Sequence, residues 1–118
     1  MRVSKPRSPA PRDGGIITSL AVKRGRPDRI AVRLDGSMAF DLAGAVVERA
    51  GLRVGDLLAS ETQERLLVED APYRARDRAL ALLALRDRSR RELETRLKLA
   101  GFSPEVASET GTWLAGLG

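Results

Sequence analysis

Three successive segments near the start of the chain alternate between apolar and polar residues. The alternation runs through residues 16–23, 29–35 and 38–42, and a period of two is typical of β-strands with one buried face. Asp35-Gly36 separates the second segment from the third, and this dipeptide favours a two-residue hairpin turn. We therefore predict a three-stranded antiparallel β-meander. A sheet this small is marginal by itself, so a helix should cover its apolar face.

Residues beyond the meander follow helical spacing instead. We predict a short helix over residues 42–50 that ends at Gly51. A second short helix is predicted over residues 60–69, opened by a Ser-x-x-Gln capping box. A third helix should cover residues 72–85, where apolar residues recur every three or four positions. The apolar stripe of this third helix consists of Ala75, Ala79, Leu82 and Leu83.

The stretch from residue 86 to residue 105 contains two helix starts and one helix stop. Ser89 with Glu92 forms a capping box, in which the hydroxyl accepts a helix N–H and the carboxylate returns to the N–H of the cap. Gly101 suits the left-handed residue just past a helix end, and Ser103-Pro104 begins the next helix. The residues expected to face the core from the capped helix are Leu93 and Leu97.

These elements predict an α+β protein with three parts. Residues 1–14 are rich in Pro, Arg and Ser and poor in apolar side chains, so we expect a disordered basic arm. Residues 15–71 should hold the β-meander and the short helices, and residues 72–118 a tri-helical unit. A chain of 118 residues is long enough for one domain or for two very small modules.

The composition excludes several classes of function. The chain has no Cys and no His, which rules out disulfides, thiolate nucleophiles, Cys/His zinc sites and a side chain that titrates near neutral pH. It shows no Walker-type loop and no apolar run of about 20 residues, the length needed to span a bilayer. The basic N-terminus lacks the apolar segment of a secretory signal. We expect a soluble, cytoplasmic, non-enzymatic protein without cofactor or metal.

The charge is unevenly distributed around a net of +5. Lys and Arg are in excess in residues 1–35 and 73–118, whereas acidic residues are in excess in residues 36–72. Basic ends around an acidic middle suggest a polyanionic or acidic partner on one side of the molecule. Solvated arginines without a partner would give the same pattern.

Four arginines crowd the corner that precedes the capped helix. Arg86 and Arg88 could satisfy the last carbonyl groups of the preceding helix, which would be a structural role. Arg90 and Arg91 lie in the first turn of their own helix, where the macrodipole disfavours cations. We therefore favour an interaction surface at this corner. The residues assigned to partner binding are Arg86, Arg88, Arg90, Arg91 and Lys98.

The other charged residues are assigned to the solvated surface, because no His or Cys accompanies them and no stacking aromatics lie among them. The acidic residues placed there are Glu61, Glu64, Glu69 and Asp70. The cations placed on the exposed face of the sheet, as a basic strip or as protection of an edge strand, are Lys23, Arg29 and Arg33. The expected i,i+4 ion pairs join Glu92 to Arg96 and Glu94 to Lys98.

Several of these motifs together resemble the RecX family of recombination regulators, in the version with an N-terminal β-extension. The less specific part consists of residues 15–18, "VRLDGSMAFDL" and "LRVGDLL". The stronger part is the pattern of the family's helical repeat, carried by Arg86, Arg88, Ser89, Glu92, Leu93, Leu97, Gly101 and Phe102. The resemblance covers roughly residues 15–118.

This resemblance implies tandem, homeodomain-like three-helix repeats that bind in the groove of a RecA filament and restrain its ATPase activity and strand exchange. Residues 73–118 would be the first repeat. Two further repeats would follow Gly118, so the resemblance implies a fragment or a natural truncation.

We accordingly expect a non-enzymatic regulator that binds RecA or its nucleoprotein filament and inhibits its activity. Single- or double-stranded DNA is a further candidate partner, whereas no membrane and no small-molecule substrate is expected. The alternative is a helix-turn-helix DNA-binding transcriptional regulator, in which the helix from Pro104 would read the major groove. That helix carries Glu105 and Glu109 and no Arg, Lys, Asn or Gln to read base edges, which argues against this alternative.

Overall fold

The computed structural model describes residues 13–117. Of these, residues 13–70 belong to one compact unit and residues 71–117 to another, and each unit is described by itself. The predicted disordered arm, residues 1–14, therefore lies almost entirely outside the described residues. Between residues 13 and 117, no helix combines the length and the apolar character that crossing a bilayer requires.

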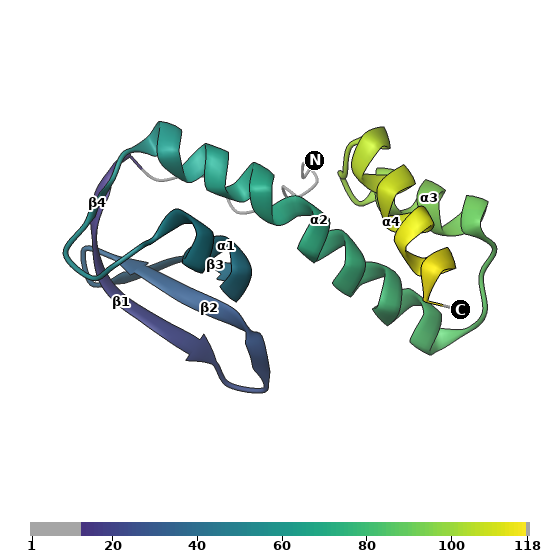
Figure 1. The fold of residues 1–118 in the computed structure, drawn as a ribbon, viewed down its shortest axis with the longest axis horizontal. Coiled ribbons are helices and arrows are strands. Elements are labelled where there is room, and N and C mark those ends of the chain that lie inside the picture. Colours follow the sequence, from purple (N-terminus) through teal and green to yellow (C-terminus); the bar gives the residue numbers. More distant parts are fainter. Residues whose placement is uncertain (1–12, 118) are drawn as a thin grey trace, which may run out of the picture. The chain divides into compact units, whose positions relative to one another are not determined.

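The first unit is built on a four-stranded antiparallel sheet with the strand order β3-β2-β1-β4 (Figure 1). Its strands are β1 (Gly15–Lys23), β2 (Arg26–Leu34), β3 (Ser37–Ala43) and β4 (Leu57–Leu58). The hairpin between β2 and β3 turns at Asp35 and Gly36, whose φ angles of 51° and 82° suit a type I′ turn. The α+β class and the meander are therefore confirmed. Strand β4 escapes prediction because two residues cannot show alternation.

An irregularity in β1 decides which of its residues are buried. The pairing of β1 with β2 shifts between Ile17 and Ser19, so Thr18 is an extra residue in a β-bulge. The bulge brings Ile17 onto the same face as Leu20, whereas strict alternation would have placed Ile16 there. Ile17 is fully buried as a result, and Ile16 is 40% exposed.

A short helix follows the sheet directly and helps to close its core. Helix α1 (Gly44–Ala50) ends at Gly51, as predicted, and Gly51 adopts a left-handed conformation with a φ of 64°. Val46 of α1 is fully buried. The other buried apolar residues of this unit include Ile17, Val32, Leu34, Phe40, Leu42, Leu58 and Leu66.

A single long helix replaces two predicted short ones. Helix α2 (Ser60–Leu85) runs through Pro72, so the expected helix end near residue 69 is wrong. A proline inside a helix removes one backbone hydrogen bond and costs about 3 kcal/mol. Apolar residues are buried on both sides of it, for example Leu66 before and Ala75 after. The burial of these residues favours the helical conformation on each side and offsets the cost of the proline.

The second unit consists of the C-terminal part of α2, helix α3 (Arg90–Leu99) and helix α4 (Pro104–Gly116) (Figure 1). Both predicted helix starts are confirmed. The side-chain oxygens of Ser89 and Ser103 each accept the N–H of the residue three positions on, at 3.1 Å. Pro104 occupies the first turn of α4, where its missing N–H costs nothing.

The stop between α3 and α4 is a Schellman motif. Gly101 has a φ of 102°, and its N–H donates to the carbonyl oxygen of Lys98 at 3.0 Å. The N–H of Phe102 donates to the carbonyl oxygen of Leu97 at 3.1 Å, and the ring packs against a small core. That core consists of Ala75, Leu97 and Ala107. Leu93 and Leu97 are 4% and 0% exposed, which confirms the predicted buried side of α3.

Gly111 lies in the middle of α4 without interrupting the helix. A Cβ atom at this position would lie 2.8 Å from both Arg90 Nε and Glu94 Oε2. In the observed conformation glycine leaves room for the two side chains from α3, and a larger residue at this position would require the flexible ends of Arg90 and Glu94 to shift.

Candidate partner-binding surface

One carboxylate ties together the arginine-rich corner before α3. Glu92 Oε2 accepts hydrogen bonds from Arg88 Nη1, at 2.8 Å, and from Arg86 Nη2. Arg88 also donates from Nε to the carbonyl oxygen of Leu82 at 3.2 Å, and its side chain is only 6% exposed. Arg88 thus satisfies a carbonyl near the end of α2, which is the structural role that its position allowed. Arg86 remains largely exposed.

Arg90 links α3 to α4. Its Nε donates to Glu94 Oε2 at 2.7 Å, and its Nη2 donates to Thr112 Oγ1 at 2.9 Å and to the Ser108 carbonyl oxygen at 3.3 Å. The Arg90 side chain lies against Gly111 of α4, where no Cβ occupies the space. The ion pair with Glu94 and the acceptors on α4 offset the unfavourable position of a cation at the N-terminus of α3.

These contacts use the acidic residues of α3 differently from what the sequence suggested. Within residues 13–117, the expected pairs of Glu92 with Arg96 and of Glu94 with Lys98 are not formed. Glu92 is instead paired with Arg86 and Arg88, which precede the helix, and Glu94 is paired with Arg90 in its first turn. Arg96 and Lys98 are therefore left without an acidic partner in the described part of the chain.

Two residues of the predicted binding set lie open on α3. Arg91 and Lys98 are exposed, and neither forms a hydrogen bond or ion pair with any residue that the structure describes. A spacing of seven residues is about two helical turns, so the two cations share one face of α3. Thr95 lies between them on the rim of a shallow hollow that Arg90 and Glu94 also line. We call Arg91 and Lys98 the α3 stripe.

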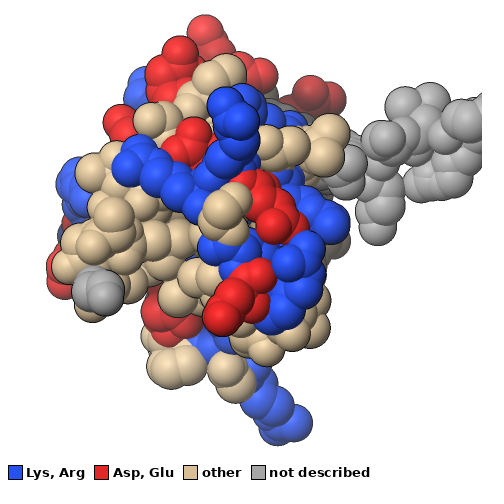
Figure 2. Space-filling view, turned by 90° about the vertical axis from the view of Figure 1, so that its right-hand side faces the viewer, with Lys and Arg blue, Asp and Glu red and all other residues tan. Residues whose placement is uncertain are grey.

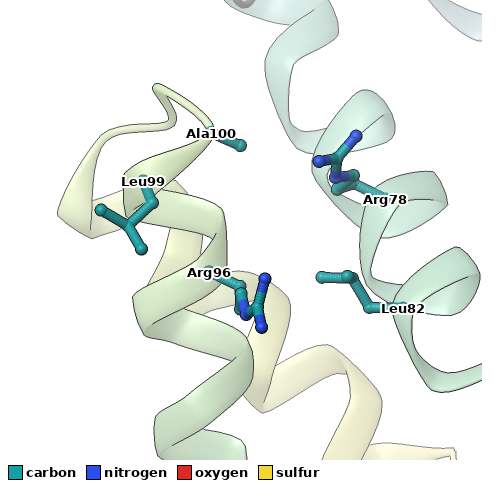
Figure 3. Close-up of a pocket in the computed structure, with 5 residues that line it drawn as sticks. All are labelled: Arg78, Leu82, Arg96, Leu99 and Ala100. Atoms are coloured by element: carbon teal, nitrogen blue, oxygen red, sulfur yellow. The ribbon is translucent and has the colours of Figure 1, made fainter. Parts of the chain in front are cut away.

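The structure also brings together two arginines that the sequence did not assign to a site. Arg78 on α2 and Arg96 on α3 are exposed and extend into the space between the two helices (Figure 3). There they line a pocket of about 180 Å³ together with Leu82, Leu99 and Ala100. Among residues 13–117, neither guanidinium has an acidic partner. The Arg78–Arg96 pocket depends on how the helices pack, so no local pattern could have revealed it.

Basic side chains do not merge into one continuous patch on this side of the molecule. Figure 2 faces the α3 and α4 side of Figure 1, and it shows Lys and Arg interspersed with Asp and Glu. The pairing of Glu92 and Glu94 with arginines agrees with this view. Binding of an acidic partner would therefore depend on the few cations that lack an acid, and not on net charge alone.

Two surface assignments made from the sequence are wrong. Arg29 is 3% exposed and Asp70 is fully buried. Arg29 Nη1 and Nη2 donate to the two oxygens of Asp70 at 3.1 and 2.8 Å, and its Nε donates to Asp41 Oδ1 at 2.9 Å. Asp70 Oδ1 also accepts the N–H of Ala43 at 2.8 Å. The cluster joins β2, β3 and α2, and no group of three possible metal ligands occurs in the described residues.

Electrostatics in this cluster favour the charged forms of Arg29 and Asp41. Burial alone would lower the pKa of Arg29 and raise that of Asp41. The hydrogen bonds and charge attraction within the cluster outweigh burial, so the pKa of Arg29 is raised and that of Asp41 is lowered. Lys23 contributes from the sheet, with its Nζ 3.1 Å from Asp41 Oδ2. Of the predicted basic strip, only Arg33 is exposed.

Comparison with known proteins shows that part of the second unit is similar to a defined protein family. Residues 75–110 match the family model described as RecX, first three-helix domain. A protein named regulatory protein RecX, from Clostridium botulinum (strain Alaska E43 / type E3), is 26% identical over 93 residues, which are 79% of this chain and 44% of that protein. Its counterpart from strain Eklund 17B (type B) is 26% identical over 89 residues, 75% of this chain and 42% of that protein. The chain thus spans less than half the length of these relatives.

The fold agrees with a solved structure as well. A crystal structure of regulatory protein RecX matches with a TM-score of 0.64 and 23% sequence identity. The match covers 87% of this chain and 50% of that chain. At this level of identity the similarity shows a shared fold.

Proposed function

Because residues 75–110 match the model of the RecX first three-helix domain, we propose that the chain is a non-enzymatic regulator that binds RecA or the RecA nucleoprotein filament. The bound protein inhibits the recombinase and DNA-dependent ATPase activities of the filament. The family match of residues 75–110 carries this proposal, since the predicted binding residues lie within that domain.

The α3 stripe supports a contact with an acidic surface on the partner. Arg91 and Lys98 have no acid to neutralise them among the described residues, so their charge is available for attraction at a distance. Arg86, also in the predicted set, is largely exposed but is paired with Glu92. Arg88 and Arg90, also in the predicted set, contribute by holding α3 against α2 and α4.

A helix-turn-helix function receives less support. Helix α4 would be the recognition helix, and its exposed residues include Glu105 and Glu109. These carboxylates would repel the DNA phosphates and could accept only from the amino groups of cytosine and adenine in the major groove. DNA contact by this unit would have to come from the cations of α3.

The proposal is tested by reversing the charge of the α3 stripe. The double variant Arg91→Glu/Lys98→Glu should lose inhibition of the DNA-dependent ATPase of RecA. Its thermal stability should stay close to that of the wild type, because neither side chain has a described partner to lose. The matched control is Arg24→Glu/Arg65→Glu, which makes the same charge change at two exposed residues of the first unit. The control should inhibit as the wild type does.

A binding measurement separates the filament from DNA as the target. A filament-specific regulator should bind RecA-coated single strands much more tightly than naked single strands. If DNA contact dominates, affinity for naked DNA should fall with salt at a log–log slope of about −0.7 per neutralised phosphate. Full inhibition by the stripe variant would show that the stripe is not the contact. An equal loss in the control would show that only net charge matters.

A further inference from the structure

We propose that the Arg78–Arg96 pocket binds one carboxylate side chain of a protein partner, from an acidic residue that has an apolar neighbour. The partner's identity rests on the proposed function, whereas the chemistry of the pocket rests on its own geometry. The two guanidinium groups come from different helices and line the same small space (Figure 3).

The first reason is unbalanced charge. Two guanidinium groups at one pocket repel each other unless an anion lies with them, and none of residues 13–117 supplies one. The nearest acids along α3 are engaged elsewhere, Glu92 by the corner arginines and Glu94 by Arg90. A carboxylate suits two guanidinium groups because each can offer it parallel N–H donors.

The second reason is the apolar lining. Leu82 is buried in the pocket wall, and Leu99 is 69% exposed at its edge. The pocket volume of about 180 Å³ is several times the roughly 30 Å³ share of one water molecule, so it can admit a side chain. The carboxylate of an acidic residue would contact Arg78 and Arg96, and the apolar neighbour of that residue would cover the exposed leucine at the pocket edge.

The same lining favours a protein over DNA as the occupant. A phosphate backbone is bound by cations, hydroxyls and backbone N–H groups, and gains nothing from an exposed leucine. Leu99 would be left in water beside a sugar-phosphate chain, whereas an apolar residue of a protein partner would cover it.

The test uses a short peptide probe and the full chain. Side-chain Nε–Hε signals of Arg78 and Arg96 are followed by NMR during titration with acetyl-Ala-Leu-Glu-Leu-Ala-amide. A saturable shift of both signals is expected, and the peptide with Gln in place of Glu should bind about tenfold more weakly or worse. The variant Arg78→Gln/Arg96→Gln should lose binding by a similar factor, and its melting temperature should be unchanged. Arg91→Gln/Lys98→Gln is the matched control and should bind the peptide as the wild type does.

Several outcomes would overturn the proposal. One is the absence of a saturable shift, and another is equal binding of the Glu and Gln peptides. Tighter binding of a 12-mer DNA duplex at the same two arginines would assign the pocket to phosphate. The ATPase assay separates this proposal from the function proposed above. If the chain binds the peptide but does not inhibit RecA, the pocket proposal stands and the RecA proposal is refuted. If the chain inhibits RecA but does not bind the peptide, the pocket proposal is refuted and the RecA proposal stands.

Discussion

Replacing Asp70 by Ala should destabilise the first unit strongly. Asp70 is fully buried, and the hydrogen bonds that it accepts include two from the Arg29 guanidinium and one from the Ala43 N–H. Truncation would leave the Ala43 N–H without this acceptor and would leave the guanidinium, whose side chain is 4% exposed, with Asp41 as its remaining anion. The expected loss of stability therefore has two causes. One buried N–H donor loses its acceptor, and one buried charge loses one of its two anionic partners.

The expected magnitude follows from these two terms. A buried unsatisfied donor costs about 1–3 kcal/mol, and breaking a buried ion pair costs about 3–5 kcal/mol when no other partner is present. Asp41 remains in contact with Arg29, at 2.7 Å to Nη2, so the charge is not isolated. We expect a total loss of about 3 kcal/mol for Asp70→Ala, which is a large part of the stability of a small domain.

Equilibrium urea unfolding followed by far-UV circular dichroism measures this loss. Asp70→Asn should cost less than Asp70→Ala, since the amide oxygen can still accept the Ala43 N–H. Glu64→Ala is the surface control, because Glu64 is exposed on the same helix and should change the free energy of unfolding by less than about 0.5 kcal/mol. A cost below about 1 kcal/mol for Asp70→Ala would refute a stabilising role for the buried cluster.

Three further predictions concern α3 and the pH dependence of stability. Leu97→Ala should cost about 2–5 kcal/mol, measured by urea unfolding with the fluorescence of Trp113, whereas Leu99→Ala at an exposed site should be nearly neutral. Ser89→Ala removes a helix cap and should cost about 1 kcal/mol in the same assay, and an unchanged midpoint would show that the cap is dispensable. The pKa of Asp41 is lowered in the folded state from a reference value of 3.8, so its contribution to stability is present above that pH and is lost as the pH falls through the folded pKa. The acid-induced loss of stability should therefore be smaller in Asp41→Asn, and an unchanged pH profile would contradict the ion pair.

The sequence by itself determined the local turns and helix ends, because the groups involved lie within a few residues of each other. Ser89 and Ser103 cap helices through bonds to the third residue on, and Gly101 ends α3 through its own backbone conformation. Asp35-Gly36 forms the hairpin for the same reason. The identity of the buried residues Leu93 and Leu97 also followed from helical period alone.

The register of β1 and the continuity of α2 depend on tertiary contacts, which the local sequence does not reveal. The bulge at Thr18 moves Ile17 to the buried face, and its position depends on pairing with β2. Local sequence preference would end a helix before Pro72, but α2 continues through it because apolar residues are buried on both sides. In both places tertiary packing overrode the structure that the local sequence pattern favours.

The candidate site shows the same division between local and tertiary information. The composition of α3 predicted a basic helix, but it could not say which cations are neutralised, because each acid had several arginines within reach. Glu92 and Glu94 pair with arginines that precede or begin α3, and these pairings leave Arg96 and Lys98 without an acidic partner among the described residues. The pocket that Arg96 shares with Arg78, and the burial of Arg29 against Asp70, join residues far apart in the chain. Tertiary structure decided these contacts because desolvation and charge pairing depend on distance in space, which the order of residues does not contain.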